Sequence, residues 1–76
     1  MNEFTLKIMK KKYYALLYND GKHFAALSQE TNEPYRVDDI SLAWLRRDSE
    51  EFEDFCKIYE DLTLIRITFT IEEIKG

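Results

Sequence analysis

Alternating apolar and polar side chains predict a β-strand near each end of the chain. Close to the N-terminus, Phe4, Leu6 and Ile8 are separated by polar residues. Residues 63–74 alternate in the same way, so one face of this strand is apolar and the other is mostly polar. Such a pattern is typical of an antiparallel sheet covered on one side. The apolar face of the last strand carries Ile65, Ile67, Phe69 and Ile71.

Between these strands, residues 13–28 (YYALLYNDGKHFAALS) predict a β-hairpin, around which we expect the rest of the chain to be arranged. Asp20-Gly21 separates two apolar runs, and both residues tolerate the positive φ that a two-residue type I′ turn requires. The register follows from this turn and predicts cross-strand pairs that include Leu17–Phe24, Leu16–Ala25 and Tyr14–Leu27.

Both faces of this hairpin are apolar, so we expect it to lie inside a sheet. One helix covers only one sheet face, and an uncovered apolar face usually marks a partner or dimer contact. Alternatively, Trp44 and the segment around Asp38 fold over it. One face carries Tyr14, Leu16, Tyr18 and Leu27. The other carries Tyr13, Leu17 and Phe24.

The run Lys10-Lys11-Lys12 lies between the first strand and the hairpin. A single strand from Phe4 to Tyr18 would be unusually long, so we expect a turn or bulge at the lysines. Beside Tyr13 and Tyr14, the lysines could form a small single-stranded nucleic-acid patch. We favour a solvated connection, because the chain is acidic overall.

Residues Asp48–Asp61 are predicted to form an amphipathic helix that begins with a capping box, Asp48 followed by Glu51. Apolar residues at helical spacing form one stripe along this helix: Phe52, Phe55, Cys56, Tyr59 and Leu62. Ile58 is expected to widen the stripe on one side. The opposite face is acidic and carries Glu50, Glu53, Asp54, Glu60 and Asp61.

The segment between hairpin and helix gives weaker signals. Residues 29–36 are a loop by composition, with Pro34 disfavouring helix at Glu33. A helical turn over Asp38–Leu42 is favoured over a short extended piece, and Trp44 is expected in or beside the core. After the last strand, residues 72–76 are expected to fray.

Composition restricts the class of protein. With 76 residues, 45% of them hydrophobic, the chain should form one domain, residues 1–76. A net charge of −4 disfavours nonspecific nucleic-acid binding, so a nucleic-acid partner is not expected. The N-terminus lacks the apolar core of a signal peptide, and no run is long enough to span a membrane. A lone cysteine suits a reducing cytoplasm.

The sequence offers little support for catalysis. His23 is the only histidine, and no Ser-His-acid arrangement or phosphate-binding glycine loop is present. We expect His23 to be a partly exposed hydrogen-bonding residue, and Cys56 to be a small buried hydrophobe. We therefore predict no enzyme activity, cofactor or metal site.

The acidic helix face could dock on a basic groove of a partner protein. The candidate contacts on this face are Glu50, Glu53, Asp54, Glu60 and Asp61. Tyr14 and Tyr18 are added as candidates from one face of the hairpin. The alternative is that the acidic side chains only keep the protein soluble.

In size, composition and order of elements, the chain resembles small accessory proteins of Gram-positive bacteriophages and mobile elements. The resemblance rests on the hairpin YYALLYNDGKHFAAL, the segment DDISLAWLRRDSEEFEDFCKIY and the strand LTLIRITFTIEEI. Some of these proteins are anti-CRISPR or other host-defence inhibitors. The resemblance therefore implies a binding inhibitor rather than a catalyst.

These patterns together predict a compact α+β domain with three or four antiparallel strands and one helix packed on them. The function we expect is that of a non-catalytic inhibitor that binds a basic surface of a host protein in the host cytoplasm. A homodimeric accessory subunit that uses the uncovered sheet face is the alternative, and single-stranded nucleic-acid binding ranks below it.

Overall fold

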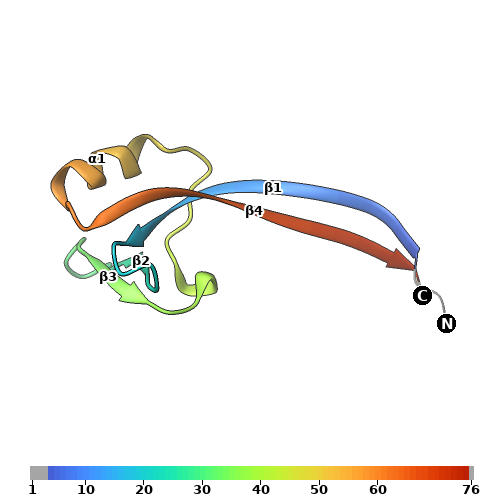
Figure 1. The fold of residues 1–76 in the computed structure, drawn as a ribbon, viewed down its shortest axis with the longest axis horizontal. Coiled ribbons are helices and arrows are strands. Elements are labelled where there is room, and N and C mark those ends of the chain that lie inside the picture. The colour runs from blue at the N-terminus through green and yellow to red at the C-terminus, as the bar shows by residue number, and fades with distance from the viewer. Residues whose placement is uncertain (1–3, 76) are drawn as a thin grey trace.

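The computed structural model describes residues 4–75 and has one α-helix and four β-strands (Figure 1). The elements in chain order are β1 (Phe4–Tyr18), β2 (Phe24–Leu27), β3 (Pro34–Val37), the 3₁₀ turn η1 (Ile40–Leu42), α1 (Glu50–Ile58) and β4 (Leu62–Lys75). The strands form one antiparallel sheet in the order β3-β2-β1-β4. This confirms the predicted α+β fold class.

The sheet is very uneven in length, because β1 and β4 continue far beyond the other strands (Figure 1). Residues 4–12 of β1 pair with residues 68–75 of β4 and form a two-stranded ribbon, which we call the arm. The remaining elements, with residues 13–18 and 62–67, form the body. The described molecule measures 51 × 24 × 22 Å. Its radius of gyration is 15.7 Å, whereas a compact domain of this length has about 11 Å.

Two expectations about these strands are wrong. The lysine run does not interrupt β1, because Lys10, Lys11 and Lys12 continue the ladder opposite Thr70, Phe69 and Thr68. The one irregularity in this pairing lies between Thr5 and Lys7. Residues 72–75 do not fray either, since they pair with the start of β1; Gly76 lies outside the described residues.

The core forms where α1 packs on one face of the body. Phe52, on the inner side of α1, is fully buried against Leu16 and Tyr18 of β1 and Leu62 of β4. The Trp44 ring meets the Phe52 ring edge to face, with centroids 4.7 Å apart. Trp44 therefore packs against the core, as predicted. The face covered by the helix is the one that carries Tyr14, Leu16 and Tyr18.

The helix is shorter than the predicted Asp48–Asp61. Ser49 rather than Asp48 is its N-cap residue, and no side chain there bonds a free backbone N–H. Chain direction changes at Tyr59, so Leu62 belongs to β4 instead of the helix stripe. Ile58 is 71% exposed and does not widen the stripe.

The hairpin has the predicted central pair but a different turn. Leu17 lies opposite Phe24, as expected. Gly21 has φ of 68°, whereas Asp20 does not have positive φ, so the turn is not type I′. The N–H of Gly21 donates to the C=O of Tyr18 (3.0 Å), in the manner of a type I turn followed by a left-handed glycine.

Beyond this one pair, β2 leaves β1 and a non-local segment takes its place. The N–H of Trp44 donates to the C=O of Ala25 (3.0 Å). Tyr14 and Arg46 exchange two backbone hydrogen bonds, of 2.7 and 3.0 Å. The predicted pairs Leu16–Ala25 and Tyr14–Leu27 are therefore not formed.

Residues 29–42 contain more regular structure than predicted. Pro34–Val37, expected in a loop or at its end, forms the edge strand β3. The predicted helical turn exists as η1. Asp39 caps this turn, because its Oδ1 accepts a hydrogen bond from the Ser41 N–H (2.9 Å). This bond is the main cause of a lowered pKa for Asp39.

Candidate functional site

A carboxylate–histidine cluster lies at the hairpin turn. His23 Nδ1 is 2.6 Å from Asp20 Oδ2, and His23 Nε2 is 2.8 Å from Asp38 Oδ1. Asp20 Oδ1 also accepts hydrogen bonds from the backbone N–H groups of Lys22 (2.8 Å) and His23 (3.1 Å). These contacts, the Lys22 bond foremost and then the imidazole, lower the pKa of Asp20 from 3.8 to about 2.

Arginine extends this cluster across the strand ends. Arg36 lies 3.7 Å from both Asp20 and Asp61, and its guanidinium stacks over the Tyr18 ring at 4.2 Å. Both ring nitrogens of His23 are engaged by carboxylates, so neither is available to a substrate. The cluster therefore ties the hairpin turn to β3 and to the start of β4, which is a structural role.

The charge of Asp20 should make the stability of the protein depend on acidity. Its pKa is lower folded than unfolded, so its contribution is present above about pH 4 and is lost as the pH falls towards about 2. In Asp20→Asn, we expect lower stability than wild type near neutral pH, measured by denaturant titration. The difference should shrink below about pH 4. A difference that does not change with pH would contradict this role.

Cys56 offers little nucleophilic chemistry. Its side chain is half-buried between α1 and β4. Burial raises the pKa of the Cys56 thiol, against a hydrogen bond from the backbone N–H of Leu64 that lowers it. The net shift is upward, so the thiolate is scarcer at neutral pH than for a free cysteine. The side chain packs against the core like a small hydrophobe, but it is half-buried where a buried one was predicted.

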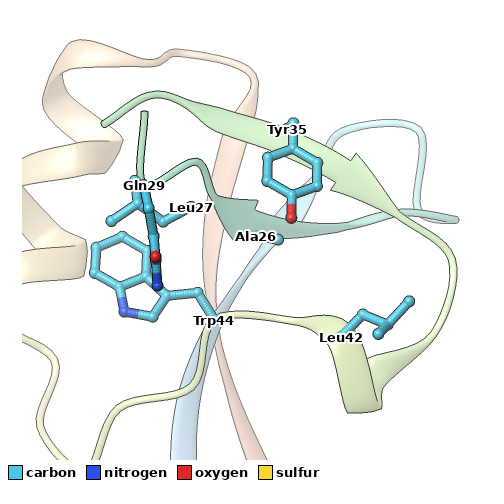
Figure 2. Close-up of a pocket in the computed structure, with 6 residues that line it drawn as sticks. All are labelled: Ala26, Leu27, Gln29, Tyr35, Leu42 and Trp44. Atoms are coloured by element: carbon cyan, nitrogen blue, oxygen red, sulfur yellow. The ribbon is translucent and has the colours of Figure 1, made fainter. Parts of the chain in front are cut away.

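An open hollow of about 280 Å³ lies beside β2 and β3 (Figure 2). Trp44 and Leu42 contribute its apolar walls, and Figure 2 shows the Tyr35 hydroxyl pointing toward Ala26. Gln29 adds the one amide. None of the lining side chains is a carboxylate, histidine or cation, so the hollow has no group for acid–base chemistry near neutral pH.

The arm exposes large apolar side chains on the sheet face away from α1. Directly opposite residues share a sheet face, so the pairs Met9–Ile71, Lys11–Phe69 and Tyr13–Ile67 lie on the face away from α1. We call this the open face. Met9 is 39% exposed and Ile71 is 41% exposed.

A groove of about 440 Å³ crosses the open face where the arm joins the body. The rings of Tyr13 and Phe69 meet edge to face at 5.7 Å, and Leu45 approaches them from the segment beside β1. Lys11 and Ile71 line the outer part. Closer to the body, Ala15 and Ala26 on this face are buried, so the exposed apolar surface lies on the arm.

The candidate acidic residues Glu50, Glu53, Asp54, Glu60 and Asp61 are all exposed, as predicted. Two of them have nearby cations: Lys57 is 3.8 Å from Asp54, and Arg36 is 3.7 Å from Asp61. The neighbouring Glu51 pairs with Arg46 at 3.1 Å. The acidic surface is therefore partly neutralised by the chain itself.

The other two candidates, Tyr14 and Tyr18, lie on the face that α1 covers. Tyr18 is only 5% exposed, and burial is the main cause of a raised pKa for its hydroxyl. Tyr14 is half-buried and packs against the core. Neither ring therefore belongs to an open contact surface. Sequence reasoning missed Met9, Leu45, Phe69 and Ile71, although the alternation in residues 63–74 marked two of them as one apolar face.

Comparison of the chain with known protein families, curated proteins and solved structures finds no match. Among residues 4–75, no cluster of three or more histidine, cysteine or carboxylate side chains is arranged to hold a metal ion. Within the same residues, no helix has the length and apolarity needed to cross a membrane.

Proposed function

We propose that the protein is a non-catalytic interaction protein that contacts its protein partner through the arm. The observation that supports this most directly is the open face, where Met9 and Ile71 are exposed on the arm beyond the groove that Leu45 lines. A two-stranded ribbon alone is only marginally stable in water. A contact that covers its apolar face would stabilise it, as in other protein interfaces.

Docking of the acidic helix face on a basic protein surface is a second proposal, and an inhibitor of a host protein is one form it could take. Its support is the exposure of Glu50, Glu53 and Asp54 on the side of α1 opposite Phe52. The arm is favoured over this face because charged side chains are soluble without a partner, whereas exposed apolar rows are not.

Site-specific photo-crosslinking in cells that make the protein tests these proposals together. A photoreactive amino acid at position 11, which lines the groove, should form an adduct with a protein partner. The same group at the exposed position 30 of the loop is the matched control and should form none. The adduct should be lost in Ile71→Asp, because a carboxylate replaces part of the apolar contact.

Two results would contradict the arm as the contact. One is the absence of any adduct at position 11. The other is an adduct that persists in Ile71→Asp but disappears when Glu53→Lys and Asp54→Lys are combined, which would assign the contact to the acidic helix face. Both sets of side chains are exposed, so neither change should unfold the protein.

A further inference from the structure

The outer edge of β4 has unpaired backbone groups whose positions follow from the ladder on its other side. In an antiparallel strand, each residue directs its N–H and C=O to the same edge, and alternate residues use opposite edges. Tyr14 gives both groups to Arg46, on the side of β1 away from β4. Arg66, directly opposite Tyr14, therefore points its own N–H and C=O away from β1.

The same rule applies to the other even-numbered residues of β4, because the register is unbroken from the Tyr18–Leu62 pair to the Ile8–Glu72 pair. Leu64 agrees with it, since its backbone N–H lowers the pKa of the Cys56 thiol on α1 and must therefore point away from β1. The helix thus closes the edge at Leu64. From Arg66 to Glu72, the outward groups have no described strand beside them, since β4 is the last strand of the sheet.

Natural edge strands are usually protected by lysine, proline or a bulge, which prevents other chains from pairing with them. In this edge, the five residues between Arg66 and Glu72 are Ile-Thr-Phe-Thr-Ile, all of them favourable in strands. No irregularity interrupts the pairing of this part of β4 with β1. The edge is therefore suited to accept another strand.

We propose that the strand it accepts is the same edge of a second copy, paired antiparallel about a two-fold axis at Phe69. This inference rests on the proposed function of the arm and identifies its partner, whose own Ile67, Phe69 and Ile71 lie beside those of the open face. In this register, Arg66 of the first copy lies opposite Glu72 of the second, and Glu72 of the first copy lies opposite Arg66 of the second. The remaining opposite pairs are Ile67–Ile71, Thr68–Thr70 and Phe69–Phe69.

Charge selects this register over its neighbours. Arg66 and Glu72 lie on one sheet face, three residues either side of Phe69, and neither makes an ion pair among the described residues. A shift of the axis by one residue places Arg66 opposite Thr70 or Ile74 instead. Opposite charges directly across a ladder are favourable. Of these three positions of the axis, only the one at Phe69 pairs Arg66 with Glu72. The two-fold arrangement also closes the assembly at two copies.

The backbone geometry permits about eight hydrogen bonds between the two edges, since Arg66, Thr68, Thr70 and Glu72 all point outward. Phe69 then forms a non-hydrogen-bonded pair with its copy, which brings the two rings close together. One pair of short strands is a small interface, below about 1,200 Å². We therefore expect a dimer that forms at micromolar concentration.

Sedimentation velocity of the full chain at increasing concentration tests the dimer and its register. Wild type should change from monomer to dimer. Arg66→Glu and Glu72→Arg each place like charges opposite one another twice, so each should weaken the dimer by about ten- to a hundredfold. An equimolar mixture of the two variants should form a heterodimer, and a chain with both substitutions should dimerise again. Glu33→Arg, in an exposed loop, is the matched control and should dimerise like wild type.

Amide hydrogen exchange provides a second readout. The amides of Thr68 and Thr70 point outward and should become protected as the dimer forms, whereas those of Ile67 and Phe69 face β1 and are protected already. The inference would be overturned if the wild type stays monomeric or assembles into fibres. It would also be overturned if the mixed Arg66→Glu and Glu72→Arg chains do not form a heterodimer. In the crosslinking experiment, an adduct with a different protein would also overturn it while supporting the proposed function; no adduct would contradict the proposed function itself.

Discussion

Phe52→Ala is expected to lower the free energy of unfolding by about 3–5 kcal/mol. Phe52 is the one fully buried aromatic residue of the described core, and its ring packs edge to face on Trp44. Removing it leaves a cavity between α1 and the sheet, in addition to the lost burial of the ring. A domain of this size is stable by roughly 4–11 kcal/mol. The variant should therefore be marginally folded or unfolded at room temperature.

Denaturant titration measures this effect, and Ile58→Ala is the matched control on the same helix. Ile58 is 71% exposed, so its truncation should change stability by less than about 0.5 kcal/mol. If the two variants were equally stable, α1 would not pack through Phe52. Near-ultraviolet circular dichroism of the Phe52→Ala chain should also lose the signal of the ordered Trp44 ring, because the two rings fix each other.

The packing face of α1 could be predicted because its signal is local. Phe52, Phe55, Cys56 and Tyr59 recur at helical spacing, and a helix with one apolar stripe has only one way to meet a sheet. The ends of the helix were less predictable. Asp48 and Ser49 both suit an N-cap, and the chain reverses at Tyr59 before the stripe is complete. Leu62 continues the spacing by coincidence and packs from β4.

The arm could not be predicted from β1 alone, because three consecutive lysines resemble a solvated break. The informative signal lies in the partner strand. Residues 65–71 alternate regularly within the predicted strand 63–74, and a strand of that length needs a neighbour of similar length. Lys10 and Lys12 fall on the face with Thr68 and Thr70, where their charge is solvated, so the run is compatible with a ladder.

The open face could not be predicted from any local sequence pattern. The segment Trp44–Arg46 replaces β2 as the neighbour of β1. It does so through backbone hydrogen bonds, which almost any residue can form and which the sequence therefore does not reveal. This arrangement puts Leu45 on the open face beside Tyr13 and directs Trp44 into the core. The sequence left open whether the second hairpin face stays uncovered or is folded over. In the structure, Ala15 and Ala26 on that face are buried, and Leu17 and Phe24 are half-buried.

The hairpin turn shows the same division between local and non-local information. Asp-Gly correctly predicted a turn and the opposition of Leu17 and Phe24. It did not predict the turn type, because Asp20 uses its carboxylate to bind the N–H groups of Lys22 and His23. That arrangement keeps Asp20 out of the left-handed region and leaves Gly21 as the one residue of the turn with positive φ.

Gly21→Val should therefore destabilise the protein by about 1–3 kcal/mol, because a β-branched residue strongly resists positive φ. Space is not the reason: a Cβ at this position meets no atom within 4 Å. Gly21→Asn is the matched control, since asparagine adopts the left-handed conformation more readily, and it should lose clearly less stability. Denaturant midpoints of the two variants measure the difference. Equal midpoints for wild type and Gly21→Val would mean that the turn does not need a left-handed residue, whereas equal losses in both variants would point to a crowded site instead of a strained backbone.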